Sequence, residues 1–216
     1  MLLAHAPAGY LLTRIVTRTI FKDLVRPARS NRLYQSLMAV GILGAIFPDF
    51  DFVYHLFIDS SRTSHHAYLT HIPLFWFGVW GVTAALATMR KQRVFLAIVT
   101  IFCLNALLHL SLDTLTGVIY WLYPLSHKGI NIFKVTDVHL FWVENFTHHW
   151  TFLIEIAIVA AAMIVFLRIR ETAAEIVRLF RTHGTLRAIT ARLAVCAAGI
   201  AVVALVASIK AHDFRS

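Results

Sequence analysis

The sequence has few charged residues, and acidic residues are especially scarce. Only 11 of its 216 residues are Asp or Glu, and charged residues of both signs make up 14% of the chain. Hydrophobic residues make up 59%. This balance lies far from that of soluble globular domains. We therefore interpret the chain as an integral membrane protein, too short for an additional soluble domain.

Cysteine is also rare, and low-complexity tracts and internal repeats are absent from the sequence. Cys103 and Cys196 both lie in apolar runs, so no disulfide framework is indicated. The N-terminus lacks the basic start of a secretory signal peptide, and we expect it to belong to the mature protein. The sequence thus predicts a single membrane domain over residues 1–216, with a core that carries the chemistry at about 1–155.

Long apolar runs predict an all-α, polytopic transmembrane bundle with five full spans. A short apolar segment over residues 2–16 precedes them and is expected either to span the membrane or to re-enter it. A polar loop is expected over 48–71, another over 124–149, and a cytosolic helix over 168–192. The five spans are expected at about 33–47, 72–89, 94–123, 150–167 and 193–209.

The distribution of basic residues predicts the orientation of the bundle. Fifteen of the 20 Lys and Arg residues lie in the segments 14–32, 90–93 and 168–192. By the positive-inside rule these segments are cytoplasmic. Nearly all histidines then fall on the opposite side. We therefore expect a multi-pass protein of the inner membrane whose site opens toward the periplasmic or extracellular side.

A polar stripe interrupts the most apolar of these runs. Asn105, His109 and Asp113 are spaced at i, i+4 and i+8, so they share one face of a helix. Ionisable residues inside a membrane span are costly and indicate a functional site. His109 and Asp113 are correctly spaced for two metal ligands, with Asn105 bonded to His109 behind them. Alternatively, the pair bonds only to each other or to a neighbouring helix.

Three further clusters of ligand-type residues fall on the same outer half of the membrane. Asp49 and Asp51 follow a span, His66 and His71 precede the next one, and His5 lies near the N-terminus. With His109 and Asp113 they exceed the needs of one four-coordinate zinc ion. They suit one or two divalent ions, with enough ligands for a third, and zinc is the metal we expect. Such a centre would hydrolyse its substrate with a metal-activated water, with Asp49 and Asp51 also taking part in catalysis.

A second polar set lies around the start of the fourth predicted span. His148 and Glu155 share a helical face, and with His149 they are candidates for a general acid or base. Glu155 could instead pair with a neighbouring helix, and His149 could be an interfacial residue. Candidates for contact with an anionic headgroup are Arg62, His127 and Lys128.

The ordered set of motifs resembles the YdjM-like family of inner-membrane proteins, regarded as metal-dependent hydrolases. The resemblance covers roughly residues 1–125 and implies a metal site made of His5, Asp49, Asp51, His66, His71, His109 and Asp113. The pattern is also loosely similar to that of zinc-dependent phospholipase C and single-strand nucleases, which implies a phosphoester substrate. The motifs are His5, the segment Gly44-Ala45-Ile46-Phe47-Pro48-Asp49-Phe50-Asp51, the segment His66-Ala67-Tyr68-Leu69-Thr70-His71, and His109-Leu110-Ser111-Leu112-Asp113 with Gly117 and Pro124.

Three functions are compatible with these patterns. The first is a metal-dependent hydrolase acting on a lipid phosphoester, with membrane lipid as both environment and substrate. The second is a metal or proton transporter or sensor, which would need polar groups in both halves of the membrane. The third is a non-catalytic assembly factor whose polar residues join helices. Nucleic acid is not expected as a partner, because the basic surface and the His/Asp set fall on opposite sides, and the patterns say nothing of the oligomeric state.

Overall fold

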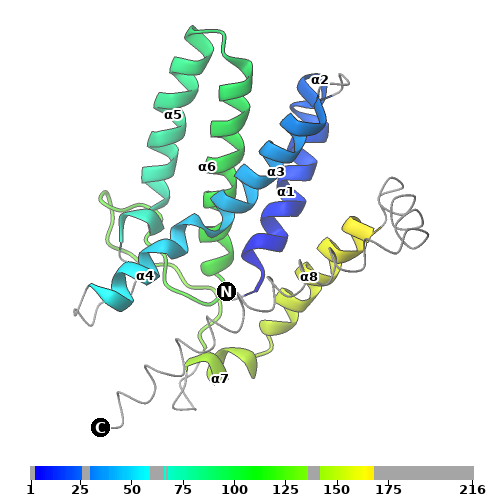
Figure 1. Ribbon diagram of the computed structural model, residues 1–216. Coiled ribbons are helices and arrows are strands. Elements are labelled where there is room, and N and C mark those ends of the chain that lie inside the picture. The colour runs from blue at the N-terminus through cyan, green and yellow to red at the C-terminus, as the bar shows by residue number, and fades with distance from the viewer. Residues whose placement is uncertain (1–2, 26–29, 59–65, 67, 136–141, 168–216) are drawn as a thin grey trace.

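The computed structural model describes residues 3–25, 30–58, 66, 68–135 and 142–167 (Figure 1). This part of the chain is all-helical, as predicted, and its one β pairing is an isolated antiparallel bridge between Ile119 and Ile130. The expected cytosolic helix, the last predicted span and Arg62 lie outside the described residues.

Five long helices make up the bundle in the described part of the chain. α6 (Arg93–Asp113) contacts α1 (His5–Thr19), α3 (Ser30–Ile46) and α5 (Pro73–Met89), and α8 (Phe152–Leu167) packs against α1. The shorter helices are α2 (Lys22–Val25), η1 (Phe47–Asp49), α4 (Phe50–Phe57), η3 (Leu69–His71) and α7 (Trp142–Thr147). Pro73 begins α5 at the one place where a helix tolerates proline without losing a hydrogen bond.

Two helical stretches are long and apolar enough to cross a membrane. They are Arg32–Phe52, which includes η1, and Arg93–Asp113. α5 and α8 are apolar but shorter, with 17 and 16 residues. α5 lies where a span was predicted, and α8 begins two residues after the predicted start. The described part of the chain therefore contains two candidate spans, and the five-span topology stays a prediction.

Two predictions about the extent of the helices were wrong. The span expected over 94–123 ends as a helix at Asp113, where the N–H groups of Thr116 and Gly117 turn back to the Asp113 carbonyl oxygen at 3.1 and 2.6 Å. The apolar residues that follow fold onto the bundle, and Ile119 is buried beside Trp76 and Leu110. In addition, the loop expected over 48–71 contains helix α4.

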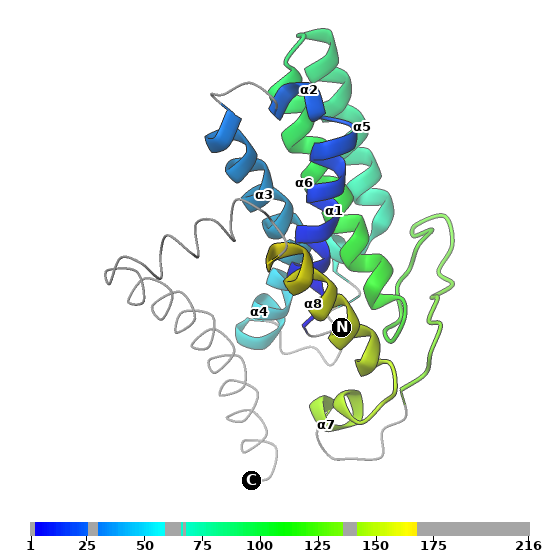
Figure 2. The same cartoon turned by 90° about the vertical axis from the view of Figure 1, so that its right-hand side faces the viewer.

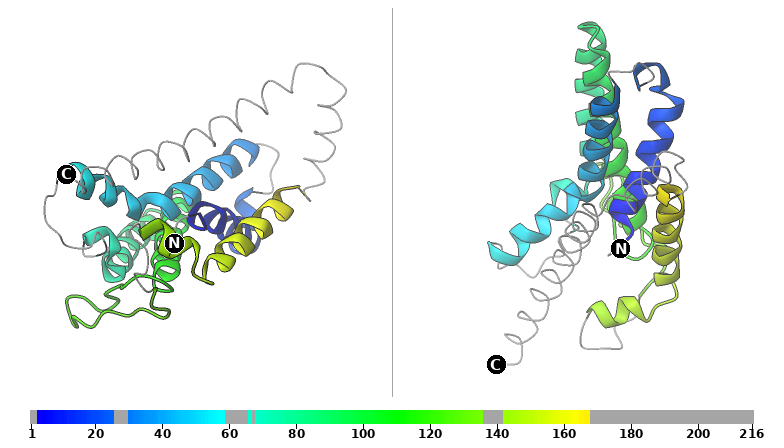
Figure 3. Two further views of the ribbon diagram at one scale, coloured as in Figure 1. Left: turned by 90° about the horizontal axis from the view of Figure 1, so that it is seen from below. Right: turned by 45° about the vertical axis from the view of Figure 1, so that its right-hand side comes forward.

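The two ends of the bundle differ in chemistry. α1 begins, α3 ends, α5 begins and α6 ends at the lower end in Figure 1, and Figure 3 (left) looks onto that end. The predicted His and Asp ligands lie there. Basic residues of α1, α2 and the turn between α5 and α6 lie toward the other end, among them Arg18, Lys22, Arg90, Lys91 and Arg93. The basic residues and the His and Asp ligands, which fall in different segments of the sequence, thus also lie toward opposite ends of the bundle.

Candidate metal centre

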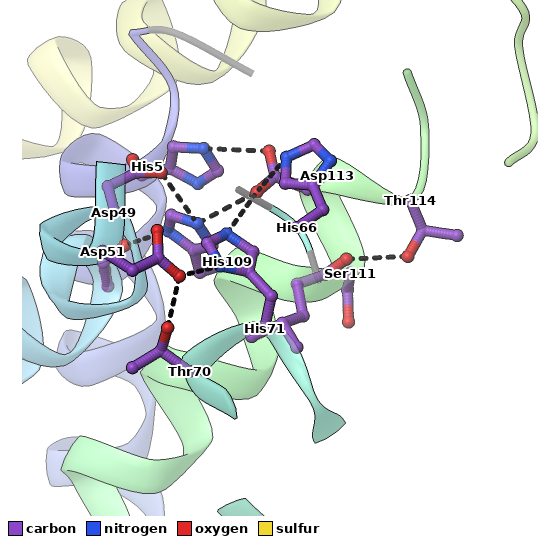
Figure 4. Close-up of polar contacts among 12 residues, drawn as sticks. His5, Asp49, Asp51, His66, Thr70, His71, His109, Ser111, Asp113 and Thr114 are labelled. Atoms are coloured by element: carbon purple, nitrogen blue, oxygen red, sulfur yellow. Dashed lines mark hydrogen bonds and ion pairs between the residues drawn. The ribbon is translucent and has the colours of Figure 1, made fainter. Parts of the chain in front are cut away.

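Four side chains from three segments meet at the lower end of the bundle (Figure 4). Asp49 comes from η1, His71 from η3, and His109 and Asp113 from the last turns of α6. One ligand atom from each lies within 4.8 Å of all the others. Three of the four residues are buried, whereas the Asp49 side chain is 43% exposed. The cluster therefore has a closed interior and one open side, at Asp49.

The Asp113 carboxylate is the centre of this cluster. Its Oδ1 lies 3.2 Å from Nε2 of His5. Its Oδ2 lies 2.9 Å from Nε2 of His109, 3.7 Å from Nε2 of His71 and 3.9 Å from Nε2 of His66. The two oxygens thus face different sets of imidazoles, an arrangement suited to a carboxylate that bridges two ions. The His5 and His109 rings stack at a centroid distance of 3.8 Å, so the two sets lie side by side.

The spacing of these atoms is compatible with coordination of a shared metal ion. Ligand atoms about 2.0–2.1 Å from a tetrahedral zinc ion lie roughly 3.3 Å from one another. Nε2 of His109 lies 3.4 Å from Oδ1 of Asp49 and 2.9 Å from Oδ2 of Asp113. Nevertheless, this buried nitrogen makes no hydrogen bond within the described part of the chain. Its lone pair and the two carboxylates would all be satisfied by a shared cation.

The opposite nitrogens of His71 and His109 are held by fixed acceptors. Nδ1 of His109 donates to the Ala45 carbonyl oxygen at 2.7 Å, and Nδ1 of His71 donates to Oδ2 of Asp51 at 2.6 Å. A proton on Nδ1 leaves Nε2 as the free lone pair in the neutral ring. Metal-ligating histidines are typically oriented in this way by a carboxylate or a backbone carbonyl. Both imidazoles are therefore oriented as ligands toward Asp113.

Asp51 is itself held in place from behind. The Thr70 hydroxyl donates to the same Oδ2 atom, and the Thr70 carbonyl accepts a bond of 2.8 Å from the Trp76 indole N–H. Burial alone would lower the pKa of His71, but the carboxylates of Asp113 and Asp51 outweigh it and raise that pKa above its ordinary value. A cation at Nε2 must therefore compete with a proton, and its affinity increases with pH.

Gly117 makes room for His66. A Cβ atom at position 117 would lie 2.5 Å from Cε1 and 2.9 Å from Nδ1 of the His66 ring. These distances are too short for any side chain to be tolerated without moving the imidazole. The turn after α6 and the position of His66 are therefore linked, and glycine is required where they meet.

The chain matches the model of the YdjM inner membrane protein family over residues 1–208. It belongs to this family. No curated protein and no solved structure is significantly similar to it. The resemblance found in the sequence motifs is thereby confirmed, and so is a location in the inner membrane. The family description names no activity, so the metal centre of this YdjM family member has to be interpreted from its geometry.

The structure brings together seven of the residues predicted for the site. His5, Asp49, His66, His71, His109 and Asp113 face one another directly, and Asp51 stands behind His71 rather than among the ligand atoms. The predicted stripe on one face of α6 is confirmed, because Asn105, His109 and Asp113 are all buried. Asn105, however, donates to Thr13 Oγ1 at 3.0 Å and to the Ile101 carbonyl at 2.8 Å, one helical turn away from His109.

The second predicted set, His148, His149 and Glu155, contacts the turn between α7 and α8 and the start of α1. His148 is exposed and its Nδ1 donates to the Glu144 carbonyl at 2.9 Å, while Nδ1 of His149 contacts Thr151 Oγ1 at 2.8 Å. These contacts belong to the turn between α7 and α8. Glu155 accepts backbone N–H groups at the start of α1. His127 packs edge-on against Tyr123, and Lys128 is exposed in the same loop.

Three partners in the site were not predicted from the sequence. The Ala45 carbonyl and the Thr70 hydroxyl carry no sequence signal as acceptor or donor, because any residue has a carbonyl and threonine is common. Gly117 was noted only as part of the family pattern. Ala45 holds His109, Thr70 holds Asp51, and Gly117 leaves room for His66.

Proposed function

We propose that this protein is an integral-membrane, metal-dependent hydrolase that cleaves a lipid phosphoester with a metal-activated water. The observation that carries the proposal is the convergence of the Nε2 atoms of His71 and His109 on the Asp113 carboxylate, each ring already fixed through Nδ1. Imidazole and carboxylate ligands in this combination suit zinc.

The residues of the centre have separable roles in this proposal. A bound divalent ion would lower the pKa of a coordinated water and supply positive charge for phosphoryl oxygens. His71, His109 and Asp113 would hold it from the buried side. Asp49, on the open side, is placed to accept the proton of an attacking water. His5, which faces the other oxygen of the Asp113 carboxylate, would help to hold a second ion, and His66 lies on the same side as His71 and His109.

The surroundings of the open side favour a lipid substrate. Phe47 and Phe50 flank Asp49 in the chain and are 39% and 54% exposed. Leu69, next to Thr70, is also exposed. Exposed apolar side chains next to these site residues in the chain suit a substrate with an acyl chain and a phosphate headgroup, and the predicted orientation would open the site to the outer leaflet.

Metal content provides the first test. Zinc bound to the protein purified in detergent is measured for the wild type, His109→Ala and Asp113→Ala, with His127→Ala as the histidine control outside the cluster. We expect loss of metal in the first two variants, because each removes a central ligand, and retention in the control. Full retention of metal in both ligand variants would overturn the metal assignment.

Hydrolysis provides the second test. The metal-loaded protein is incubated with vesicles of a total membrane lipid extract, and phosphorus-containing products are identified by mass spectrometry. We expect a product that the wild type forms and His109→Ala does not. Metal-dependent flux into proteoliposomes without any lipid cleavage would instead support a transporter that uses the same residues.

A further inference from the structure

The start of α1 carries no cap of its own. Its N-cap residue is Ala4, which makes no side-chain hydrogen bond to the helix, and the preceding residue is Leu3. The first N–H groups of any α-helix lack partners within the helix. Ala4 is fully buried, so water cannot easily supply the missing acceptors. Another part of the chain has to provide them.

Glu155 of α8 supplies that acceptor. Its Oε2 accepts the N–H of Leu3 and, at 3.1 Å, the N–H of Ala4. The Glu155 side chain is fully buried. Figure 2 shows α8 beside the N-terminal part of α1, and an edge contact between Phe166 and Tyr10 joins the two helices further along. A carboxylate suits this place because it both accepts the N–H groups and balances the positive end of the helix dipole.

The residue next to this cap is a member of the metal centre. His5 follows Ala4 directly, its Nε2 lies 3.2 Å from Oδ1 of Asp113, and its ring stacks on His109. Because His5 begins the helix, a displacement of the first turn of α1 would move its imidazole by a similar distance. The only residue of α1 in the centre thus depends on a contact made by α8.

We propose that Glu155 is a positioning residue, which fixes the first turn of α1 and thereby holds His5 against Asp113. The inference rests on the proposed function, since it gives His5 a place in the metal centre. It assigns Glu155 no contact with substrate or metal. It also gives α8, which contributes no ligand, a reason to pack on α1.

The test is a double-mutant cycle between positions 155 and 5. Glu155→Met keeps the length of the side chain but removes the acceptor, whereas Glu155→Gln retains an amide oxygen that can accept the same N–H groups. Each is made alone and with His5→Ala. The apparent affinity for zinc is measured by competition with a chelator, and the visible absorption of the cobalt-substituted protein reports the geometry at the metal.

We expect Glu155→Met to weaken the affinity by about tenfold or more and to change the cobalt spectrum, as a lost supporting contact typically does. Glu155→Gln should stay close to the wild type. In the His5→Ala background, Glu155→Met should have no further effect. Equal effects in both backgrounds, or an unchanged spectrum in Glu155→Met, would show that Glu155 is merely structural. If Glu155→Met does not fold, the shorter Glu155→Asp replaces it in the same cycle.

A readout without metal separates this inference from the proposed function. Amide hydrogen exchange in the apo-protein is followed for the peptide covering residues 3–9. Glu155→Met should accelerate its exchange, whereas His109→Ala should not, because only the first loses the cap. Unchanged exchange in Glu155→Met would overturn the inference even if the wild type binds zinc. Accelerated exchange in Glu155→Met, together with a wild-type protein that binds no metal, would support the cap and refute the proposed function alone.

Discussion

At the scale of single residues, two histidine rings are each held through Nδ1 by a fixed partner. Nδ1 of His109 donates to the Ala45 carbonyl, and its Nε2 faces Asp113 and Asp49. Nδ1 of His71 donates to Asp51, and its Nε2 faces Asp113. Both rings are thus preorganised before any ion arrives.

Asp51 should therefore tune the metal centre without holding the ion. In Asp51→Asn the acceptor for His71 loses its charge but keeps its size. We expect the affinity for zinc to fall by about 10–100-fold, the usual cost of losing such a supporting group. Chelator competition measures it, with Asp23→Asn at the other end of the bundle as control. An affinity equal to that of the wild type would show that Asp51 does not orient His71.

At the scale of helices, close contact between backbones brings the site residues into register. A Cβ atom on Gly44 of α3 would lie 2.5 Å from the Phe102 carbonyl oxygen of α6. Small residues allow such approach between helices in membranes. Gly44 lies one residue before Ala45, whose carbonyl holds His109. The close approach of α3 to α6 thus also places the Ala45 carbonyl that orients His109.

Gly44→Ala should destabilise the protein, because the neighbour it meets is backbone and cannot rotate away. We expect a loss of about 1–3 kcal/mol, the usual cost of overpacking. Thermal unfolding in detergent measures it. The matched control is Gly78→Ala in α5, where an added Cβ meets nothing within 4 Å and stability should be unchanged or slightly higher. Equal midpoints for the two variants would contradict the close contact.

The sequence predicted the helices better than their ends. Apolar runs identified α5 and α6 because composition and length suffice for that. They could not show that α6 stops at Asp113, since the residues after it are equally apolar and find their burial by folding back near Trp76. The ligands were predictable from their types and their common side. The supporting role of Asp51 and the cap by Glu155 were not, because both depend on tertiary contacts that leave no local pattern.

At the scale of the whole molecule, the chemistry is divided between two ends. If the basic end faces the cytoplasm, the His/Asp end faces outward. Cysteine labelling tests this in a variant carrying Cys103→Ala and Cys196→Ala. With Leu125→Cys the new thiol should react with an impermeant maleimide in intact cells, and with Gln92→Cys only after lysis. Both positions are exposed; Gln92 directly precedes α6, and Leu125 lies in the loop that follows it. The reverse labelling pattern would invert the orientation.

Metal should also stabilise the molecule as a whole, because the ligands come from segments spread between His5 and Asp113. A ligand that binds only the folded state at 100 times its Kd adds about 2.7 kcal/mol. Removal of metal by a chelator should therefore lower the unfolding temperature by several degrees, and zinc should restore it. In His109→Ala the chelator should have no effect. A wild-type midpoint indifferent to chelator would contradict a metal that joins these segments.

The cap on α1 also imposes an order of events during synthesis. Ala4 leaves the ribosome well before Glu155, because the side chain that accepts its N–H is 151 residues further along the chain. At about 5–20 residues per second, roughly 8–30 s separate the two. Through that interval the first turn of α1 has no acceptor from Glu155, and every ligand from His5 to Asp113 is made before the interval ends. Assembly of the centre is thus completed only after α8 has been translated.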